Sequence, residues 1–129
     1  MLAFRQAVEA QDMQAAVATL AEGVRFRSPI VFREYEGRDE VGMVLMAVSR
    51  VFQDFRYDRE IGSEQGADHA LVFRARVGDR DLEGVDLLHT NADGEVDELV
   101  VMVRPMSAAL ALQKAMAEML AEAQPGGTP

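Results

Sequence analysis

Cysteine is absent from this chain of 129 residues, and lysine occurs only once, at Lys114. Without a thiol the chain cannot form a disulfide, a thiolate zinc site, an iron–sulfur cluster or a cysteine nucleophile. No apolar run approaches the roughly 20 residues that cross a bilayer, and residues 1–5 do not open a secretion signal. We therefore expect a cytoplasmic protein.

Positive charge is both scarce and dispersed. The 13 basic residues are outnumbered by 22 acidic ones, which gives a formal net charge of -9, and the arginines stand singly among acids, as Arg33 does beside Glu34. A protein with this charge is repelled by phosphate backbones and anionic membrane surfaces unless its basic side chains gather in one patch. We expect neither a nucleic acid nor a membrane as a partner.

Motifs of well-known enzyme classes are missing as well. The sequence has no Gly-x-Ser-x-Gly elbow, no phosphate-binding loop ending in Gly-Lys and no Gly-x-Gly-x-x-Gly turn. His69 and His89 lack the spacing of metal ligands. Residues 91–95 resemble a calcium loop only in part, because His89 and Val100 stand where that loop requires acids. We expect no metal and no cofactor.

Helical periodicity dominates the N-terminal third of the chain. Apolar residues recur at three- and four-residue spacing over residues 4–8 and 13–20, which predicts two short helices. Asp12 is the expected N-cap of the second helix, and Gly23 is expected to end this helical pair. A longer helix is predicted over residues 39–52, where an apolar stripe follows two acidic residues in the first turn.

Strand periodicity appears between and after these helices. Residues 24–28 alternate apolar and polar side chains as far as Pro29. Four more strands are predicted, separated by glycine-containing turns, over residues 55–63, 69–77, 80–90 and 95–104. Short turns make these neighbours antiparallel. The last strand is apolar on both faces, so we expect one face to meet the helices and the other to meet a second subunit.

The C-terminal part is predicted to be helical over residues 106–122. This helix either caps one end of the domain or contacts a partner subunit. Residues 123–129 are rich in glycine and proline, which predicts disorder. With 49% hydrophobic residues in the chain, residues 1–122 are expected to form a single domain with one core.

Two segments carry a family resemblance. Residues 84–96 place an acid on a strand shortly before an Asp-Gly turn, and residues 26–41 join an early strand through Ser28 and Pro29 to the start of the long helix. These segments, and the order of elements over residues 2–105, resemble the nuclear-transport-factor-two-like superfamily, which includes SnoaL-like proteins and ketosteroid isomerases. The resemblance implies an α+β fold in which a curved antiparallel sheet wraps around N-terminal helices and one long helix. The expected result is a cone with an interior pocket, plus a C-terminal helix.

The resemblance to ketosteroid isomerases extends to one of their three catalytic groups. Those enzymes use an Asp base together with a Tyr and a protonated Asp that stabilise the dienolate. Asp86 matches the protonated Asp, whereas Ser28 stands at the position of the base and Phe4 at that of the Tyr. Because a serine hydroxyl has no useful basicity near neutral pH, steroid isomerisation by that route is not expected.

Asp86 is the candidate catalytic residue. It lies on an otherwise apolar strand, and a carboxyl that faces an apolar cavity resists ionisation, so its pKa should rise. The alternative is a structural Asp that is satisfied by a neighbouring side chain. The candidate ligand-binding residues are those expected on the inner surface or at the mouth of the cone: Ser28, Tyr35, Tyr57, Phe73, Leu88, Leu99 and Val101.

The other notable side chains are expected to be structural. We expect His69 at the exposed start of its strand and His89 on the outer face. Arg74 and Arg76 share one face of their strand, where acids of the neighbouring strand would pair with them. Six methionines are expected in the core, with a plastic ligand surface as the alternative: Met43, Met46, Met102, Met106, Met116 and Met119.

Three functions remain open from the sequence. The first is a homodimeric protein, paired through its outer sheet face, whose pocket binds a small, mostly hydrophobic molecule around Asp86. The second, implied by the resemblance to SnoaL-like cyclases with one inward acid, is a cyclase, isomerase or dehydratase that uses Asp86 as acid or base. The third is a non-catalytic interaction module with a filled cone.

Overall fold

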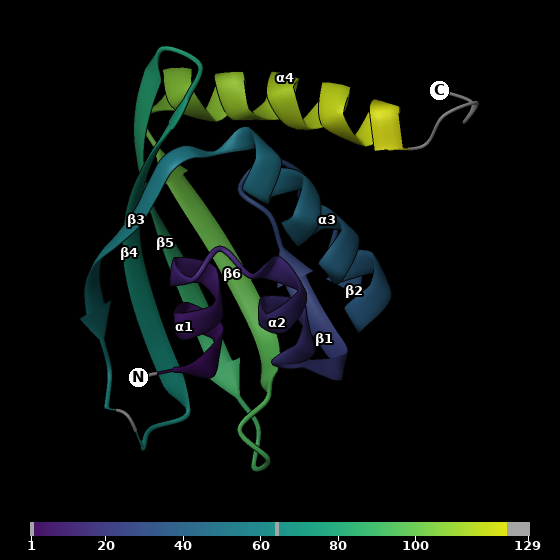
Figure 1. Ribbon diagram of the computed structural model, residues 1–129, viewed down its shortest axis with the longest axis vertical. Coiled ribbons are helices and arrows are strands. Elements are labelled where there is room, and N and C mark those ends of the chain that lie inside the picture. The colour runs from purple at the N-terminus through teal and green to yellow at the C-terminus, as the bar shows by residue number, and fades with distance from the viewer. Residues whose placement is uncertain (1, 64, 124–129) are drawn as a thin grey trace.

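The computed structural model describes residues 2–63 and 65–123 as helices packed on one curved sheet. The helices are α1 (Ala3–Glu9), α2 (Met13–Ala18), α3 (Arg38–Val51) and α4 (Met106–Ala123). The strands are β1 (Leu20–Arg27), β2 (Tyr35–Glu36), β3 (Gln53–Ile61), β4 (Asp68–Val77), β5 (Arg80–Thr90) and β6 (Val96–Arg104). Figure 1 shows α1, α2 and α3 against one side of the sheet and α4 at one end. This is the predicted α+β cone.

The sheet has the strand order β2-β1-β6-β5-β4-β3. The four strands from β3 to β6 form an antiparallel meander, as their short turns predict. The sequence did not reveal how β1 joins them: it pairs with β6 in parallel and with β2 antiparallel. The long connection from β1 through α3 and the meander allows this parallel pairing.

The start of β1 differs from the prediction. The second helix ends at Ala18 and β1 begins at Leu20, not at Val24, so Gly23 lies inside the strand and does not end a helix. Leu20 fitted the helical periodicity because it is fully buried, but it is buried as a strand residue that pairs with Val96. A shift in register before Arg25 then restores the alternation expected of the later residues.

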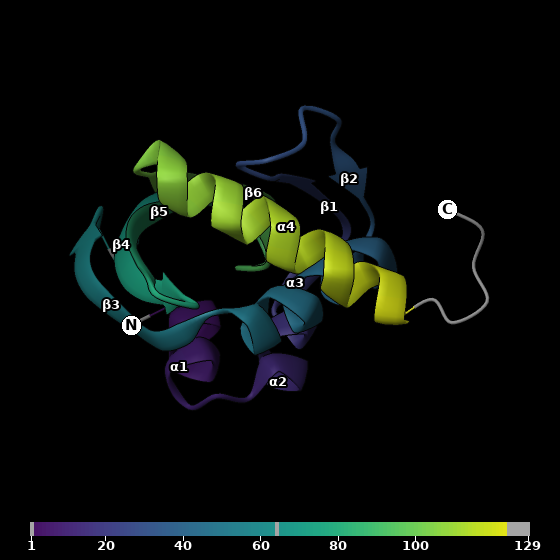
Figure 2. The same cartoon turned by 90° about the horizontal axis from the view of Figure 1, so that it is seen from above.

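The helices lie close to where the periodicity predicts them. Asp12 caps α2 as expected, because its side chain accepts a hydrogen bond from the Ala15 amide. The apolar stripe of α3 is buried against β1, α2 and α4. In Figure 2, α4 crosses above α3 and the strands β5 and β6, so this helix caps the cone. It runs one residue beyond the predicted end, to Ala123, and residues 124–129 of the predicted tail lie outside the described residues.

Two expectations about single side chains are wrong. His69 is buried, because β4 begins at Asp68 and the alternation of the strand then places His69 on the inner face with Leu71. The six methionines do not all lie in the core: Met116 is buried there, whereas Met43, Met102 and Met106 are exposed. The arginines of β4 lie on the outer face as predicted: Arg74 pairs with Asp58 and Glu83, and Arg76 pairs with Asp54.

Candidate functional site

A cavity of about 740 Å³ lies between the helices and the concave face of the sheet. Apolar side chains from every layer line it: Phe4 of α1, Phe26 of β1, Val48 of α3, Leu99 of β6 and Met116 of α4. Strand curvature creates the hollow, and α4 covers one end of it. The cone is therefore not filled by its own side chains.

Asp86 lies on the wall of this cavity. It follows the inward alternation of β5, between Gly84 and Leu88, and is only 7% exposed. Its Oδ2 accepts a hydrogen bond of 2.9 Å from the hydroxyl of Tyr57, on the edge strand β3. The prediction of a buried, inward carboxyl is confirmed, and Tyr57 is the neighbouring side chain that satisfies it.

Burial raises the pKa values of both Asp86 and Tyr57. Loss of hydration raises the pKa of Asp86 to about 7, and the hydrogen bond from Tyr57, which favours the carboxylate, lowers it by a smaller amount. The pKa of Tyr57 is also raised, first by burial and then by the negative charge of Asp86, so Tyr57 stays a hydrogen-bond donor. Near neutral pH, Asp86 therefore exists both as an acid that can donate a proton and as a carboxylate that can accept one.

Tyr57 is held in place from two sides. The ring of Phe55 meets it edge-on, with 5.0 Å between the ring centroids. On the other side, the guanidinium of Arg5 in α1 lies 5.7 Å from the centroid of the Tyr57 ring, and its Nη1 is 2.8 Å from a carboxylate oxygen of Glu60. This ion pair joins α1 to β3 beside the Tyr57 ring.

Sequence reasoning missed Arg5 and Glu60. The simple alternation of β3 would place Phe55, Tyr57, Arg59 and Ile61 on the inner face, but the register shifts between Tyr57 and Arg59. After this shift Glu60 pairs with the inward Leu71, and Ile61 is 50% exposed. No local pattern signals a bulge of this kind.

The other candidate residues fall into two groups. Ser28, Tyr35, Leu99 and Val101 line the cavity together with Tyr57. Ser28 uses its Oγ to accept hydrogen bonds from the amides of Ile30 (3.1 Å) and Val31 (3.0 Å), so it supports the loop that follows β1. The remaining two, Phe73 and Leu88, share the inner face but are buried in the core behind the wall.

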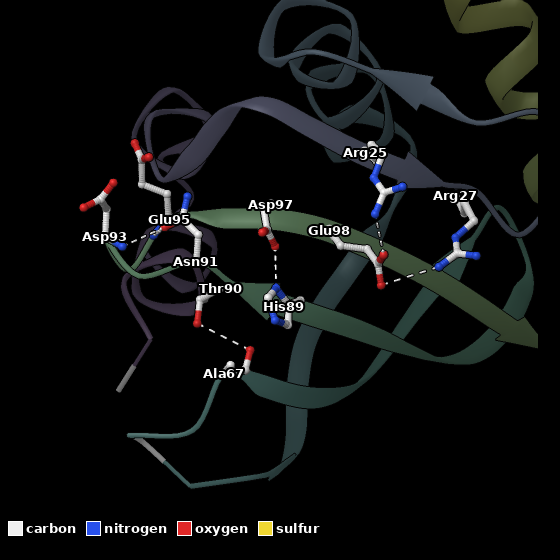
Figure 3. Close-up of polar contacts among 10 residues, drawn as sticks. All are labelled: Arg25, Arg27, Ala67, His89, Thr90, Asn91, Asp93, Glu95, Asp97 and Glu98. Carbon is white, nitrogen blue, oxygen red and sulfur yellow. Dashed lines mark hydrogen bonds and ion pairs between the residues drawn. The ribbon is translucent and has the colours of Figure 1, made fainter.

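The outer face of the sheet carries a separate polar cluster, which Figure 3 shows. His89 lies there, as predicted, with its Nδ1 2.6 Å from Oδ1 of Asp97, and this hydrogen bond raises the pKa of His89. Nearby, Arg25 and Arg27 both reach Glu98. Because His89 points away from the cavity, it does not assist Asp86.

Within residues 2–63 and 65–123 no three His, Cys, Asp or Glu side chains gather in an arrangement that fits a metal ion. Over the same residues no helix combines the length and hydropathy of a membrane span. The cytoplasmic location and the lack of a nucleic-acid partner stay predictions.

Comparison with known proteins identifies close structural relatives. No family model and no curated protein sequence matches the chain. A steroid delta-isomerase from Pseudomonas aeruginosa is 37% identical, with 92% of this chain and 87% of that chain covered and a TM-score of 0.87. An uncharacterised bacterial protein with a cystatin-like fold, from Silicibacter pomeroyi, is 38% identical, with coverages of 95% and 86% and a TM-score of 0.86. An NTF2-like protein from Cytophaga hutchinsonii shares the fold at 20% identity, coverages of 82% and 88%, and a TM-score of 0.64.

Proposed function

This chain belongs to the nuclear-transport-factor-two-like superfamily, and from that premise we propose that its cavity binds a small, mostly apolar molecule. The molecule presents a hydrogen-bond acceptor, such as a carbonyl oxygen, to the protonated carboxyl of Asp86. One observation carries this proposal: the buried Asp86, hydrogen-bonded to the partly buried Tyr57, lies on the wall of an otherwise apolar cavity.

The dimensions and lining of the cavity support a ligand of this class. Small-molecule sites commonly enclose roughly 300–1,000 Å³ and combine apolar walls with a few placed polar groups. A volume of about 740 Å³ lies in this range. The alternative of a non-catalytic interaction module assumed a cone filled by its own side chains, and a cavity of this size does not support it.

The Tyr57–Asp86 pair defines what the ligand must offer. When Asp86 is neutral, one of its oxygens accepts the Tyr57 hydrogen bond and its O–H is available to the cavity. A ligand without an acceptor would displace water and leave this donor unpaired, which costs about 1–3 kcal/mol. The site should therefore prefer a ketone to a hydrocarbon of the same shape.

Proton transfer by Asp86 is the second candidate function. The relative named as a steroid delta-isomerase favours it, as does a carboxyl whose pKa, near 7, suits both loss and gain of a proton at neutral pH. Ser28 provides no base, and its Oγ is engaged with two backbone amides. A cyclase, isomerase or dehydratase reaction here would use Asp86 alternately as base and acid.

Binding and turnover can be tested separately. We expect native mass spectrometry to show androstenedione, a diketone, bound to the protein, and androstane, its hydrocarbon parent, bound much less. Asp86→Leu, which removes the hydrogen-bond donor, should weaken androstenedione binding, and Asp86→Asn should abolish turnover in an enzyme. Turnover is measured as the ultraviolet absorbance of the conjugated enone formed from an unconjugated ketosteroid. Equal binding of the two steroids would contradict the assigned role of Asp86.

A second copy of the chain is the partner that we propose for the outer face. Val85 lies opposite Met102, and Leu87 opposite Val100, so the four form one apolar patch in which Met102 is 53% exposed. Met102→Asp should convert a dimer into a monomer in analytical ultracentrifugation. Met43→Asp, on the exposed side of α3, is the matched control and should not. A native chain that sediments as a monomer at all concentrations would contradict the dimer.

A further inference from the structure

The loop from Ser28 to Glu34, between β1 and β2, forms part of one wall of the cavity. Ile30 and Val31 line the cavity, yet the next residue, Phe32, is fully exposed to solvent. An aromatic ring is the side chain that gains most from leaving water, so a fully exposed one at the rim of an apolar hollow needs a role. Figure 2 shows this loop rising from the end of β1 beside α4, which lines the same cavity.

The two ends of this loop are anchored. At the first end, Ser28 Oγ accepts hydrogen bonds from the amides of Ile30 and Val31. At the second end, the Arg33 guanidinium stacks 4.3 Å from the centroid of the Tyr35 ring, and its Nη1 is 3.2 Å from Glu40 on α3. The segment that carries Phe32 therefore lies between two fixed points.

Between these anchors the backbone is not tied to the rest of the fold. In the described part of the chain, no backbone–backbone hydrogen bond joins residues 29–34 to another element. A rotation of the backbone at Phe32 would break no sheet or helix hydrogen bond and would leave the bonds from Ile30 and Val31 to Ser28 in place. Phe32 directly follows Ile30 and Val31, which already form part of the apolar rim, so this rotation is the movement available to its ring.

We propose that Phe32 acts as an apolar lid that closes over an occupied cavity, next to the rim that Ile30 and Val31 form, and contacts the ligand. This inference rests on the proposed binding function and deepens it. Closure requires a ligand whose apolar body reaches the mouth of the cavity, because the ring gains nothing by covering a water-filled hollow. The lid thus selects molecules large enough to fill the cavity, such as fused-ring compounds.

A single tryptophan reports on the lid directly, because the native chain contains none. Phe32→Trp places that residue on the lid, and androstenedione serves as the probe. We expect saturation with the probe to shift the tryptophan emission to shorter wavelength and to reduce its quenching by acrylamide. Ile61→Trp, at an exposed position of β3 that does not line the cavity, is the control and should show neither change.

Truncation of the ring provides the second measurement. Phe32→Ala should raise the dissociation constant of androstenedione roughly tenfold, as expected for the loss of one aromatic contact, and Ile61→Ala should not change it. The thermal midpoint of Phe32→Ala should equal that of the native chain, since the ring is exposed. Suppose that the native chain binds the probe, that the tryptophan of Phe32→Trp stays fully quenchable, and that Phe32→Ala binds the probe equally well. The lid is then refuted, and the binding function stands. If the native chain does not bind the probe, both fall.

Discussion

Replacing Asp86 with asparagine is expected to stabilise the protein at alkaline pH and to change its stability little near pH 4. In the unfolded chain this carboxyl titrates at its ordinary pKa of 3.8, whereas burial raises the pKa to about 7 in the folded protein. Between these values the folded state keeps a proton that the unfolded state has released. The free energy of unfolding therefore falls as pH rises through this window, and the fall is complete above the folded pKa.

The size of this effect follows from the two pKa values. They differ by about three pH units, and each unit corresponds to 1.36 kcal/mol, so ionised Asp86 costs roughly 4 kcal/mol above pH 7. Solvent screens this cost little, because the side chain is almost fully buried. A domain of this size has about 5–15 kcal/mol of stability in total, so the effect is readily measured.

Urea unfolding of both proteins from about pH 4 to about pH 9 tests this expectation. The difference between the two free energies of unfolding is the informative quantity, because the remaining charged groups titrate in both proteins and cancel. Asparagine keeps an oxygen that can accept the Tyr57 hydrogen bond. We expect the difference to be near zero at the acidic end, to rise in favour of Asp86→Asn, and to level off near 4 kcal/mol above pH 7.

A difference that stays flat over this range, with both proteins unfolding cooperatively, would refute the reasoning. It would mean that the carboxyl ionises as easily in the folded protein as in the unfolded chain. Asp86 would then be hydrated, and a water-poor cavity around it would no longer be tenable. The proposed hydrogen bond from neutral Asp86 to a ligand at pH 7 would lose its basis.

Two further substitutions test the surroundings of Asp86. Tyr57→Phe removes a hydrogen bond that favours the carboxylate, so it should raise the pKa of Asp86 further and move the midpoint of the same difference curve to higher pH; a move to lower pH would contradict the assignment. Gly84→Ala would place a Cβ 2.2 Å from the Cζ atom of the buried Phe73 ring, so it should reduce the free energy of unfolding in urea by about 1–3 kcal/mol. Gly23→Ala, where nothing lies within 4 Å of the added Cβ, is the control, and equal losses in the two variants would argue against tight packing at Gly84.

The fold was predictable where local periodicity and turns agree. The meander from β3 to β6 and the helix α3 fall within a few residues of their predicted bounds because each has an alternating or helical apolar pattern that ends in a turn signal. The prediction failed at Leu20, whose burial fits a helix and a strand equally well. The parallel pairing of β1 with β6 depends on contacts between residues far apart in sequence, and no local signal encodes it.

The candidate site was predictable in its centre and not in its surroundings. Asp86 stands out because it is the one acid on the inner face of an apolar strand. Its partner Tyr57 comes from a strand 29 residues away, and the support from Arg5 to Glu60 spans 55 residues, so neither contact leaves a pattern in the sequence. Alternation also predicts which face of the sheet a side chain lies on, but not whether it reaches the cavity or is covered by other side chains. Phe73 was therefore expected on the cavity wall but lies in the core.

The two leading functions predict opposite responses to pH at the same carboxyl. Binding of a ketone requires neutral Asp86 as the donor, so the affinity for androstenedione should fall as pH rises through about 7. Proton abstraction requires the carboxylate, so kcat/KM for an unconjugated ketosteroid should rise through the same pH and then level off. Ser28 adds no second ionisation, because a serine hydroxyl does not titrate in this range, so the profile should have a single step and not a bell shape. In Asp86→Asn the affinity should no longer depend on pH and turnover should be lost, and a pH dependence of binding that survives this substitution would show that another group controls the site.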